Sequence, residues 1–288
     1  DNFMEILKIL CYYKKMGNKI KKELQGKKPL KKMGQNFLLN NFAIKKIVET
    51  AKIKRNETVL EVGPGTGILT EELLKTGGKI IAVEKDKQLC SLLIKKFKGI
   101  KNIEIVEEDI LEFNIDFLPQ NYKVVANIPY YITSFFIRRF LESKNKPKKM
   151  VLTIQKEVAN RICANPPNMS LLSVSVQYYA KPRLIMKISK NSFWPKPKVD
   201  SAIIKITPFL LPKEEKTDYF FKVVKAGFSQ PRKQIINNLS KELNVPKDKT
   251  IELLLKNGFS PKKRPGDFSI EDWMKLTNCF NSDNLLLL

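Results

Sequence analysis

Residues 58–75 constrain the fold of this chain more than any other segment. The apolar run TVLEV (58–62) leads into the glycine-rich turn GPGTG (63–67), and an amphipathic stretch follows at 68–75. Glycines at such a turn let the backbone approach a ligand closely, and the start of the next helix offers free N–H groups. The segment therefore predicts a strand, a ligand-binding turn and a helix, in that order.

The alternation of strands and helices continues beyond this turn. Apolar segments predict further strands at 79–83, 103–106, 123–126 and 150–154, and amphipathic segments predict helices at 87–97 and 135–141. Apolar strands that alternate with helices are buried on both faces and indicate a parallel α/β sheet. The segments 173–179, 184–188 and 201–206 follow without intervening helices, so we expect antiparallel strands that close the edge of the sheet.

Pro208 and Pro212 mark a domain boundary, and residues 217–280 then show the periodicity of helices. We therefore predict an α/β fold with a Rossmann-like sheet over residues 32–208 and a small all-helical domain over residues 209–288. Residues 1–31 are lysine-rich and weakly patterned. We interpret them as a basic N-terminal arm, either a disordered tail, which we favour, or an RNA-binding arm.

The chain contains no histidine. This absence excludes Ser-His-Asp hydrolysis, the HExxH class of zinc enzymes and any imidazole general base. The four cysteines are far apart and form no CxxC pair, which predicts reduced thiols and no metal site. No apolar run approaches the roughly 20 residues of a membrane span, and the N-terminus does not resemble a secretory signal.

The charge of the chain is large and unevenly distributed. There are 53 Lys and Arg against 29 Asp and Glu, a net charge of +24. Residues 57–116 nevertheless carry 8 Lys and 12 acidic residues, whereas residues 181–264 carry 20 basic and 7 acidic residues. A general lysine bias would not spare one block of the sequence. We therefore expect a polyanionic partner, most simply nucleic acid.

Acidic residues stand at the ends of three predicted strands. Glu61 precedes the glycines, where it would repel a pyrophosphate but suits a cofactor with a cationic amino-acid group. Glu84 is placed to accept from both hydroxyls of a ribose, and Asp109 can accept from an adenine amine. This set predicts a pocket for S-adenosyl-L-methionine and disfavours the dinucleotide that a glycine-rich turn alone would also fit.

The segment Asn127-Ile128-Pro129-Tyr130 follows the fourth predicted strand. Methylating the exocyclic amine of a base is difficult because its lone pair is delocalised into the ring. The side-chain oxygen of Asn127 and a neighbouring backbone carbonyl can accept the two N–H bonds and localise that lone pair. Tyr130 can stack on the base once it is flipped out of its helix. This chemistry requires no histidine.

Several further motifs occur together with these residues. The sequence resembles the KsgA-type ribosomal RNA small-subunit adenine dimethyltransferases over roughly residues 31–280. The motifs that carry the resemblance, in order, are KMGQNFL (32–38), residues 61–70, 83–86 and 127–133, QKEVA (155–159), FWPKPKVDS (193–201), FSQPRK (228–233), RP (264–265) and SIED (269–272). The sequence departs from the family at three places. Pro231 and Ile236 stand where the family usually has basic residues. The loop 166–172 is shorter than usual and lacks its customary Gly and Tyr.

The resemblance implies specific roles for residues of this chain. The implied cofactor contacts are Asn36, Leu38, Gly63, Glu84, Asp109 and Asn127; the implied catalytic residues are Asn127, Pro129, Tyr130 and Phe193. Phe193 or its neighbour would stack on the target adenine opposite Tyr130.

The resemblance also implies a substrate. It is a pair of adjacent adenosines in the hairpin near the 3′ end of small-subunit rRNA, each dimethylated on N6 during late subunit assembly. The helical domain would bind this rRNA or the ribosome. We expect the protein to be a monomer located in the cytoplasm or, as the alternative, in an organelle.

Two other function classes remain as alternatives. The first is the related class that methylates an adenine of large-subunit rRNA, which shares the methyltransferase half. The second is a non-catalytic relative that serves as an assembly or transcription factor, although the acids at 84 and 109 and the NIPY segment would then have no use.

Overall fold

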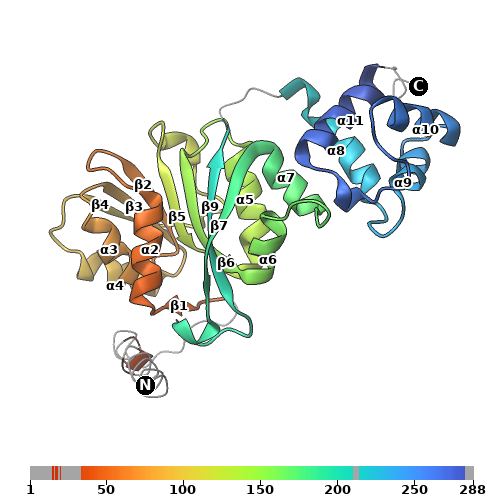
Figure 1. Cartoon of the computed structure of the whole chain (residues 1–288). Helices are drawn as coiled ribbons and strands as arrows, with labels where there is room; N and C mark the ends of the chain where they lie inside the picture. Colours follow the sequence, from red (N-terminus) through yellow and green to blue (C-terminus); the bar gives the residue numbers. More distant parts are fainter. Residues whose placement is uncertain (1–14, 16, 19, 21–33, 210–213, 283–288) are drawn as a thin grey trace. The chain divides into compact units, whose positions relative to one another are not determined.

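The computed structural model describes residues 15, 17, 18, 20, 34–209 and 214–282 of this 288-residue chain (Figure 1). The chain forms two compact units. Among the described residues, the first comprises those up to 159 together with 183–208, and the second comprises 160–182 together with those from 209 onwards. Residues 160–182 thus group with the helical unit, whereas the sequence interpretation placed them with the sheet.

The first unit is built on a mixed sheet. The elements up to the end of the sheet are β1 (Phe37–Leu38), α2 (Asn41–Ala51), β2 (Thr58–Val62), α3 (Ile68–Leu74), β3 (Lys79–Glu84), α4 (Lys87–Lys96), β4 (Ile103–Glu107), β5 (Lys123–Asn127), α5 (Thr133–Glu142), β6 (Lys149–Gln155), α6 (Lys156–Ile162), α7 (Leu171–Tyr179), β7 (Ala180–Ile188), β8 (Phe193–Trp194) and β9 (Ser201–Pro208). The seven-stranded sheet has the order β4-β3-β2-β5-β6-β9-β7, and β1 pairs with β8 in a separate two-stranded sheet.

The strand pairing confirms the predicted α/β class. β2 pairs in parallel with both β3 and β5, β3 with β4, and β5 with β6. β9 pairs antiparallel with β6, as expected for strands that close the edge. Neighbouring residues of β2, Val59 and Leu60, point to opposite faces of the sheet and are both fully buried. Helix α2 crosses in front of the strands in Figure 1 and contributes Ile44 and Ile47 to this core.

The prediction of a strand at residues 173–179 is wrong, because this segment is helix α7. Its valines and tyrosines favour β structure locally. However, Ser170 caps the helix through reciprocal hydrogen bonds with Ser173. The apolar residues Val174 and Tyr178 lie four apart on one helical face and join the core of the second unit. Capping and tertiary packing therefore override the local preference.

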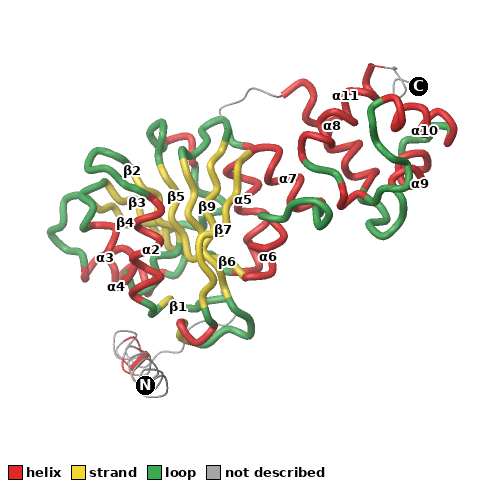
Figure 2. Tube along the Cα trace, viewed as in Figure 1, coloured by secondary structure: helices red, strands yellow, loops and turns green. Residues whose placement is uncertain are grey.

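The second unit is helical, as predicted (Figure 2). Beyond α7 it contains α8 (Glu214–Gly227), α9 (Ile235–Glu242), α10 (Lys247–Lys256) and α11 (Ile270–Ser282). Its core includes Phe268, Trp273 and Phe280, all fully buried. Ile236, which departs from the expected basic pattern, is buried in this same core, so a charged side chain would not fit there without rearrangement.

Most of the predicted N-terminal arm lies outside the described residues. Within the described part, Ile20 is buried against Phe37 and Leu89 of the first unit. No helix among the described residues is long and apolar enough to cross a membrane.

Candidate active site

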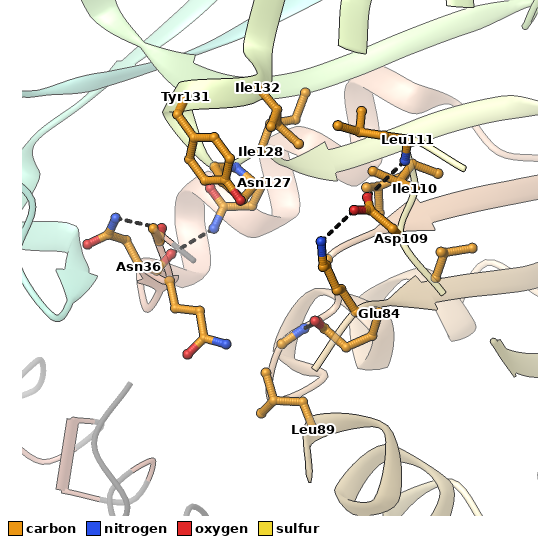
Figure 3. A pocket seen from close by; sticks show the side chains of 18 of the residues that line it. Asn36, Glu84, Leu89, Asp109, Ile110, Leu111, Asn127, Ile128, Tyr131 and Ile132 are labelled. Atoms are coloured by element: carbon orange, nitrogen blue, oxygen red, sulfur yellow. Dashed lines mark hydrogen bonds and ion pairs between the residues drawn. The ribbon is translucent and has the colours of Figure 1, made fainter. Parts of the chain in front are cut away.

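A pocket lies at the carboxyl edge of the parallel strands (Figure 3). Gly63 follows β2, Glu84 ends β3, Asp109 follows β4 and Asn127 ends β5. Strands in parallel register bring these ends together, and this edge is where ligands bind in open α/β sheets. The pocket is lined by residues 34–37, 62, 63, 65, 83–85, 89, 108–111 and 127–132.

The glycine-rich turn is shaped by backbone conformations that favour glycine. Gly63 and Gly65 have φ values of +66° and +61°. A Cβ on Gly65 would lie 2.8 Å from the ring of Phe37, so a larger residue would displace that ring from the pocket wall. The turn therefore leaves backbone, not side chain, facing the pocket at Gly63, where a Cβ would meet only the Asn127 carbonyl at 3.9 Å.

Glu84 holds the turn in place from below. One of its carboxylate oxygens accepts from the N–H of Gly65 at 3.1 Å, and the other accepts from the N–H of Asp86 at 3.0 Å. The side chain is only 8% exposed, and its burial raises its pKa in spite of these hydrogen bonds. A carboxylate so placed can still accept from hydroxyls of a ligand, because each oxygen has a second lone pair.

Asp109 is held by one side chain and one backbone group. Oδ2 pairs with the ammonium of Lys85 at 2.6 Å, and Oδ1 accepts from the N–H of Leu111 at 2.9 Å (Figure 3). Partial burial would raise the pKa of Asp109, but the hydrogen bond and charge of Lys85 lower it overall. The carboxylate is therefore ionised and is an acceptor at the rim of the pocket.

Asn127 is oriented by a backbone carbonyl from the other side of the pocket. Its Nδ2 donates to the carbonyl oxygen of Asn36 at 2.8 Å (Figure 3). Asn36 is in turn fixed by its own side chain, which donates to the carbonyl of Gly34 at 3.0 Å. Because a carbonyl can only accept, this contact fixes which way the Asn127 amide faces. The oxygen Oδ1 of Asn127 has no hydrogen bond within the described residues and remains an acceptor.

Tyr130 and Pro129 complete the wall beside Asn127. The Tyr130 hydroxyl shares a hydrogen bond of 2.7 Å with the hydroxyl of Ser201, which is fully buried at the start of β9. Burial raises the pKa of Tyr130, so the phenol stays neutral. Pro129 precedes the short 3-10 helix Tyr130–Ile132, and its carbonyl accepts from the N–H of Ile132.

Two residues implied by the resemblance do not line the pocket. Leu38 and Phe193 face each other across the β1–β8 pair and are 7% and 4% exposed. Both pack into the core beneath the sheet together with residues of α2. The structure therefore does not bring the Phe193 ring to the pocket; the neighbouring Trp194 stacks on Phe37, which does line it.

Glu61 is fully buried and does not line the pocket either. Neither of its carboxyl oxygens has a hydrogen-bond partner in the described part of the chain. Burial, reinforced by the nearby charge of Glu84, raises the pKa of Glu61 to about 8, and the Thr70 side chain only partly opposes this shift. The carboxyl of Glu61 is therefore protonated and uncharged at neutral pH.

With this geometry established, comparison with known proteins decides the family. A model of the ribosomal RNA adenine dimethylase family matches residues 26–282. The chain belongs to the ribosomal RNA adenine dimethylase family. This confirms the family identified from the sequence motifs.

Individual relatives of this dimethylase agree. A ribosomal RNA small subunit methyltransferase A from Dehalococcoides mccartyi is 44% identical over 255 residues, covering 86% of this chain and 87% of that protein. The protein of the same name from Clostridium botulinum is 40% identical, covering 86% and 93%.

Two solved structures share the fold. A dimethyladenosine transferase from Plasmodium falciparum superposes with a TM-score of 0.75 at 30% identity, covering 86% of this chain and 98% of that one. The 23S rRNA methyltransferase ErmE superposes with a TM-score of 0.73 at 27% identity, covering 85% and 99%.

The sequence interpretation missed three side chains of the dimethylase pocket. Lys85 pairs with Asp109, Ser201 holds Tyr130, and Tyr131 lines the pocket while remaining 69% exposed. All three lie in motifs quoted for the resemblance, so a signal was present without a role attached. The pairing of Lys85 with Asp109 could not be predicted, because the two residues are 24 apart and only the strand pairing brings them together.

Proposed function

We propose that this dimethylase transfers methyl groups from S-adenosyl-L-methionine to N6 of two adjacent adenosines near the 3′ end of small-subunit rRNA, and dimethylates each. The observation that carries the proposal is the amide of Asn127, which the Asn36 carbonyl orients so that its oxygen stays available. An acceptor fixed at this position suits an exocyclic amine that must give up a delocalised lone pair.

The pocket fits the proposed cofactor in the chemistry of its donor set. Glu84 supplies acceptors for ribose hydroxyls, Asp109 supplies one for the adenine amine, and Gly63 allows close approach of the backbone. Glu61 lies fully buried behind the glycine turn and outside the pocket lining, so we assign it no direct contact with the cofactor. When bound, S-adenosyl-L-methionine supplies an electrophilic methyl group. Leu38 can contribute only through its backbone, because its side chain is in the core.

The residues around the target amine then have distinct tasks. Asn127 Oδ1 accepts one N–H of the amine, and a backbone carbonyl that follows Asn127 accepts the other. The contact with the Asn36 carbonyl preorganises the Asn127 acceptor, so the amine lone pair is directed out of the ring with little reorganisation of this side chain. No neighbouring base is required, since the product proton can leave to water. This agrees with a chain that has no histidine.

Tyr130 is the aromatic platform for the flipped adenine. Its ring is held at one end by Ser201 and at the other by the turn that Pro129 begins. Fixing the ring in advance reduces the entropy lost when a base stacks on it. We assign Phe193 a different task from the one the resemblance implies. It supports β1 by pairing with it, and the first residue of β1, Phe37, lines the pocket together with the preceding Asn36.

The choice of the small subunit rests on the names of the relatives and on charge. The curated relatives are named small-subunit enzymes, whereas ErmE, of similar fold, is a 23S rRNA methyltransferase. Residues 181–264 carry 20 basic and 7 acidic side chains, which suits an rRNA surface larger than one hairpin. Residues 183–208 of this stretch belong to the first unit and residues 209–264 to the helical unit, so we propose that both units contribute to this contact. We further propose that the enzyme acts as a monomer in the compartment that holds the ribosome.

A tritiated-methyl transfer assay tests the function. The substrates are small-subunit particles from cells that lack this methylation, and protein-free 23S RNA as the alternative. We expect four methyl groups per small subunit, located on two adjacent adenosines, and none on 23S RNA. Methylation of 23S RNA alone would favour the related large-subunit class. Absence of transfer to either substrate, with the cofactor shown to bind, would favour a non-catalytic assembly factor.

A further inference from the structure

Two large aromatic side chains project from one face of α5 and the turn before it. Tyr131 and Phe135 are four residues apart and are 69% and 59% exposed. The residues of α5 that enter the core are on the other side of the helix, among them Phe136 and Phe140. Tyr131 and Phe135 thus contribute little to folding, and their rings are free to contact a partner.

These side chains border two hollows of the first unit. Tyr131 lines the pocket that contains Asn127, and Phe135 lines a second, open groove. The groove runs between α5 and the 3-10 helix Ile115–Phe117, and is lined by Asn114, Ile115, Asp116, Phe135, Arg138, Arg139, Glu142, Ser143 and Lys144.

The loop after β4 separates the pocket from the groove. Ile110 lines the pocket, and its carbonyl accepts from the guanidinium of Arg139, whose side chain lines the groove. Arg139 also donates to the carbonyl of Phe113. These contacts hold the loop between the pocket and the groove in place.

The chemistry of this path suits unpaired nucleotides. Exposed aromatic rings stack on bases, and every base offers a face for this regardless of sequence. Arg138, held by Glu142, and Lys144 add cationic groups beside Phe135. Among the residues that line the groove, Arg138, Arg139 and Lys144 outnumber Asp116 and Glu142, which suits the phosphates of a nucleic-acid strand. A nucleotide next to the target adenosine must lie at the rim of the pocket, because the RNA backbone joins it to the adenosine inside.

We propose that Tyr131 and Phe135 form a stacking surface for the unpaired nucleotides next to the target adenosine, and that the groove beside Phe135 receives the continuing RNA strand. This inference rests on the proposed function, because it takes the substrate to be rRNA that enters the pocket by one base. It adds a recognition surface that is separate from the atoms of methyl transfer.

The test uses small subunits reconstituted with rRNA that carries 5-iodouridine beside the two target adenosines. Irradiation links this base to an aromatic ring stacked on it. We expect the cross-linked peptide to contain Tyr131 or Phe135. Phe135→Ala should remove the link to that ring and raise KM for the particles by about fivefold or more, within the range for loss of one base stack. Its affinity for S-adenosyl-L-methionine should not change.

Phe42→Ala is the matched control, since Phe42 is 70% exposed on α2 and lines neither hollow. It should leave KM and the cross-link unaltered. A cross-link that maps elsewhere, or an equal KM for Phe135→Ala and wild type, would overturn the inference while methylation by the wild type still upheld the proposed function. Failure of the wild type to methylate the particles would instead refute the proposed function.

Discussion

Replacing Glu61 by Gln should change how the stability of the protein depends on pH. Glu61 is fully buried on the central strand β2, and its pKa is about 8 in the folded chain against an ordinary 4.5. Between these values the folded state keeps a proton that the unfolded state has lost. Stability must therefore fall as the pH rises from 4.5 to 8, and must be fully restored below 4.5.

The size of the effect follows from the shift. One pKa unit corresponds to about 1.4 kcal/mol, so ionising Glu61 should cost on the order of 5 kcal/mol of unfolding free energy once the pH exceeds 8. No histidine titrates in this window, because the chain has none. Glu57, with a pKa of about 2, contributes only at lower pH. Glu84, whose pKa is also raised by burial, adds a change of the same sign.

Urea unfolding without cofactor, at pH 5, 6, 7 and 8, measures this dependence. Wild type should lose stability steadily over the series. Glu61→Gln cannot ionise, so it should be nearly flat and should be more stable than wild type at pH 8. Glu104→Gln, an exposed carboxylate on the edge strand β4, is the control and should follow wild type. Parallel curves for wild type and Glu61→Gln would refute the assignment of a protonated acid behind the glycine turn.

Three further predictions concern the cofactor and the RNA. Glu84→Ala removes the acceptor of the Gly65 and Asp86 N–H groups. Calorimetry should show that the affinity for S-adenosyl-L-methionine falls by about 10- to 150-fold. An unchanged affinity would contradict the assignment of Glu84 to the ribose hydroxyls. Asp109→Ala should weaken the cofactor by a similar factor, and a loss no larger than that of Lys85→Ala would mean that only the ion pair matters. Affinity for small subunits should fall steeply between 50 and about 200 mM salt, and a flat response would argue against the basic residues of 181–264 as the RNA contact.

The sheet could be predicted from the sequence because its signals are local. Strands β2 to β6 are short apolar runs separated by turns and amphipathic helices. The pattern of apolar and polar residues therefore predicts their bounds to within a residue or two. Helix α7 could not be predicted in this way, because its valines and tyrosines are typical of strands and only the Ser170 cap and the core of the second unit decide its structure.

The pocket was predictable where one residue at a strand end carries the chemistry. Gly63, Glu84, Asp109 and Asn127 fit this description, and all four line the pocket. The hydrogen bonds that hold these side chains in place could not be predicted, because each joins residues that are distant in the chain. The contact of Tyr130 with Ser201 spans 71 residues, and that of Asn127 with the Asn36 carbonyl spans 91. Burial of Phe193 likewise follows from its pairing with β1, which no local pattern reveals.

The central claim is that Asn127 localises the lone pair of the target amine. The most direct measurement is the single-turnover rate of methyl transfer to unmethylated small subunits by Asn127→Ala, at saturating S-adenosyl-L-methionine because this residue also lines the cofactor pocket. Asn102→Ala, whose side chain bonds the Gly78 carbonyl before β3, is the matched control. The account predicts a rate at least about a hundredfold lower for Asn127→Ala, with particle affinity unchanged and the control at the wild-type rate. Dimethylation of both adenosines by Asn127→Ala at near the wild-type rate would contradict it.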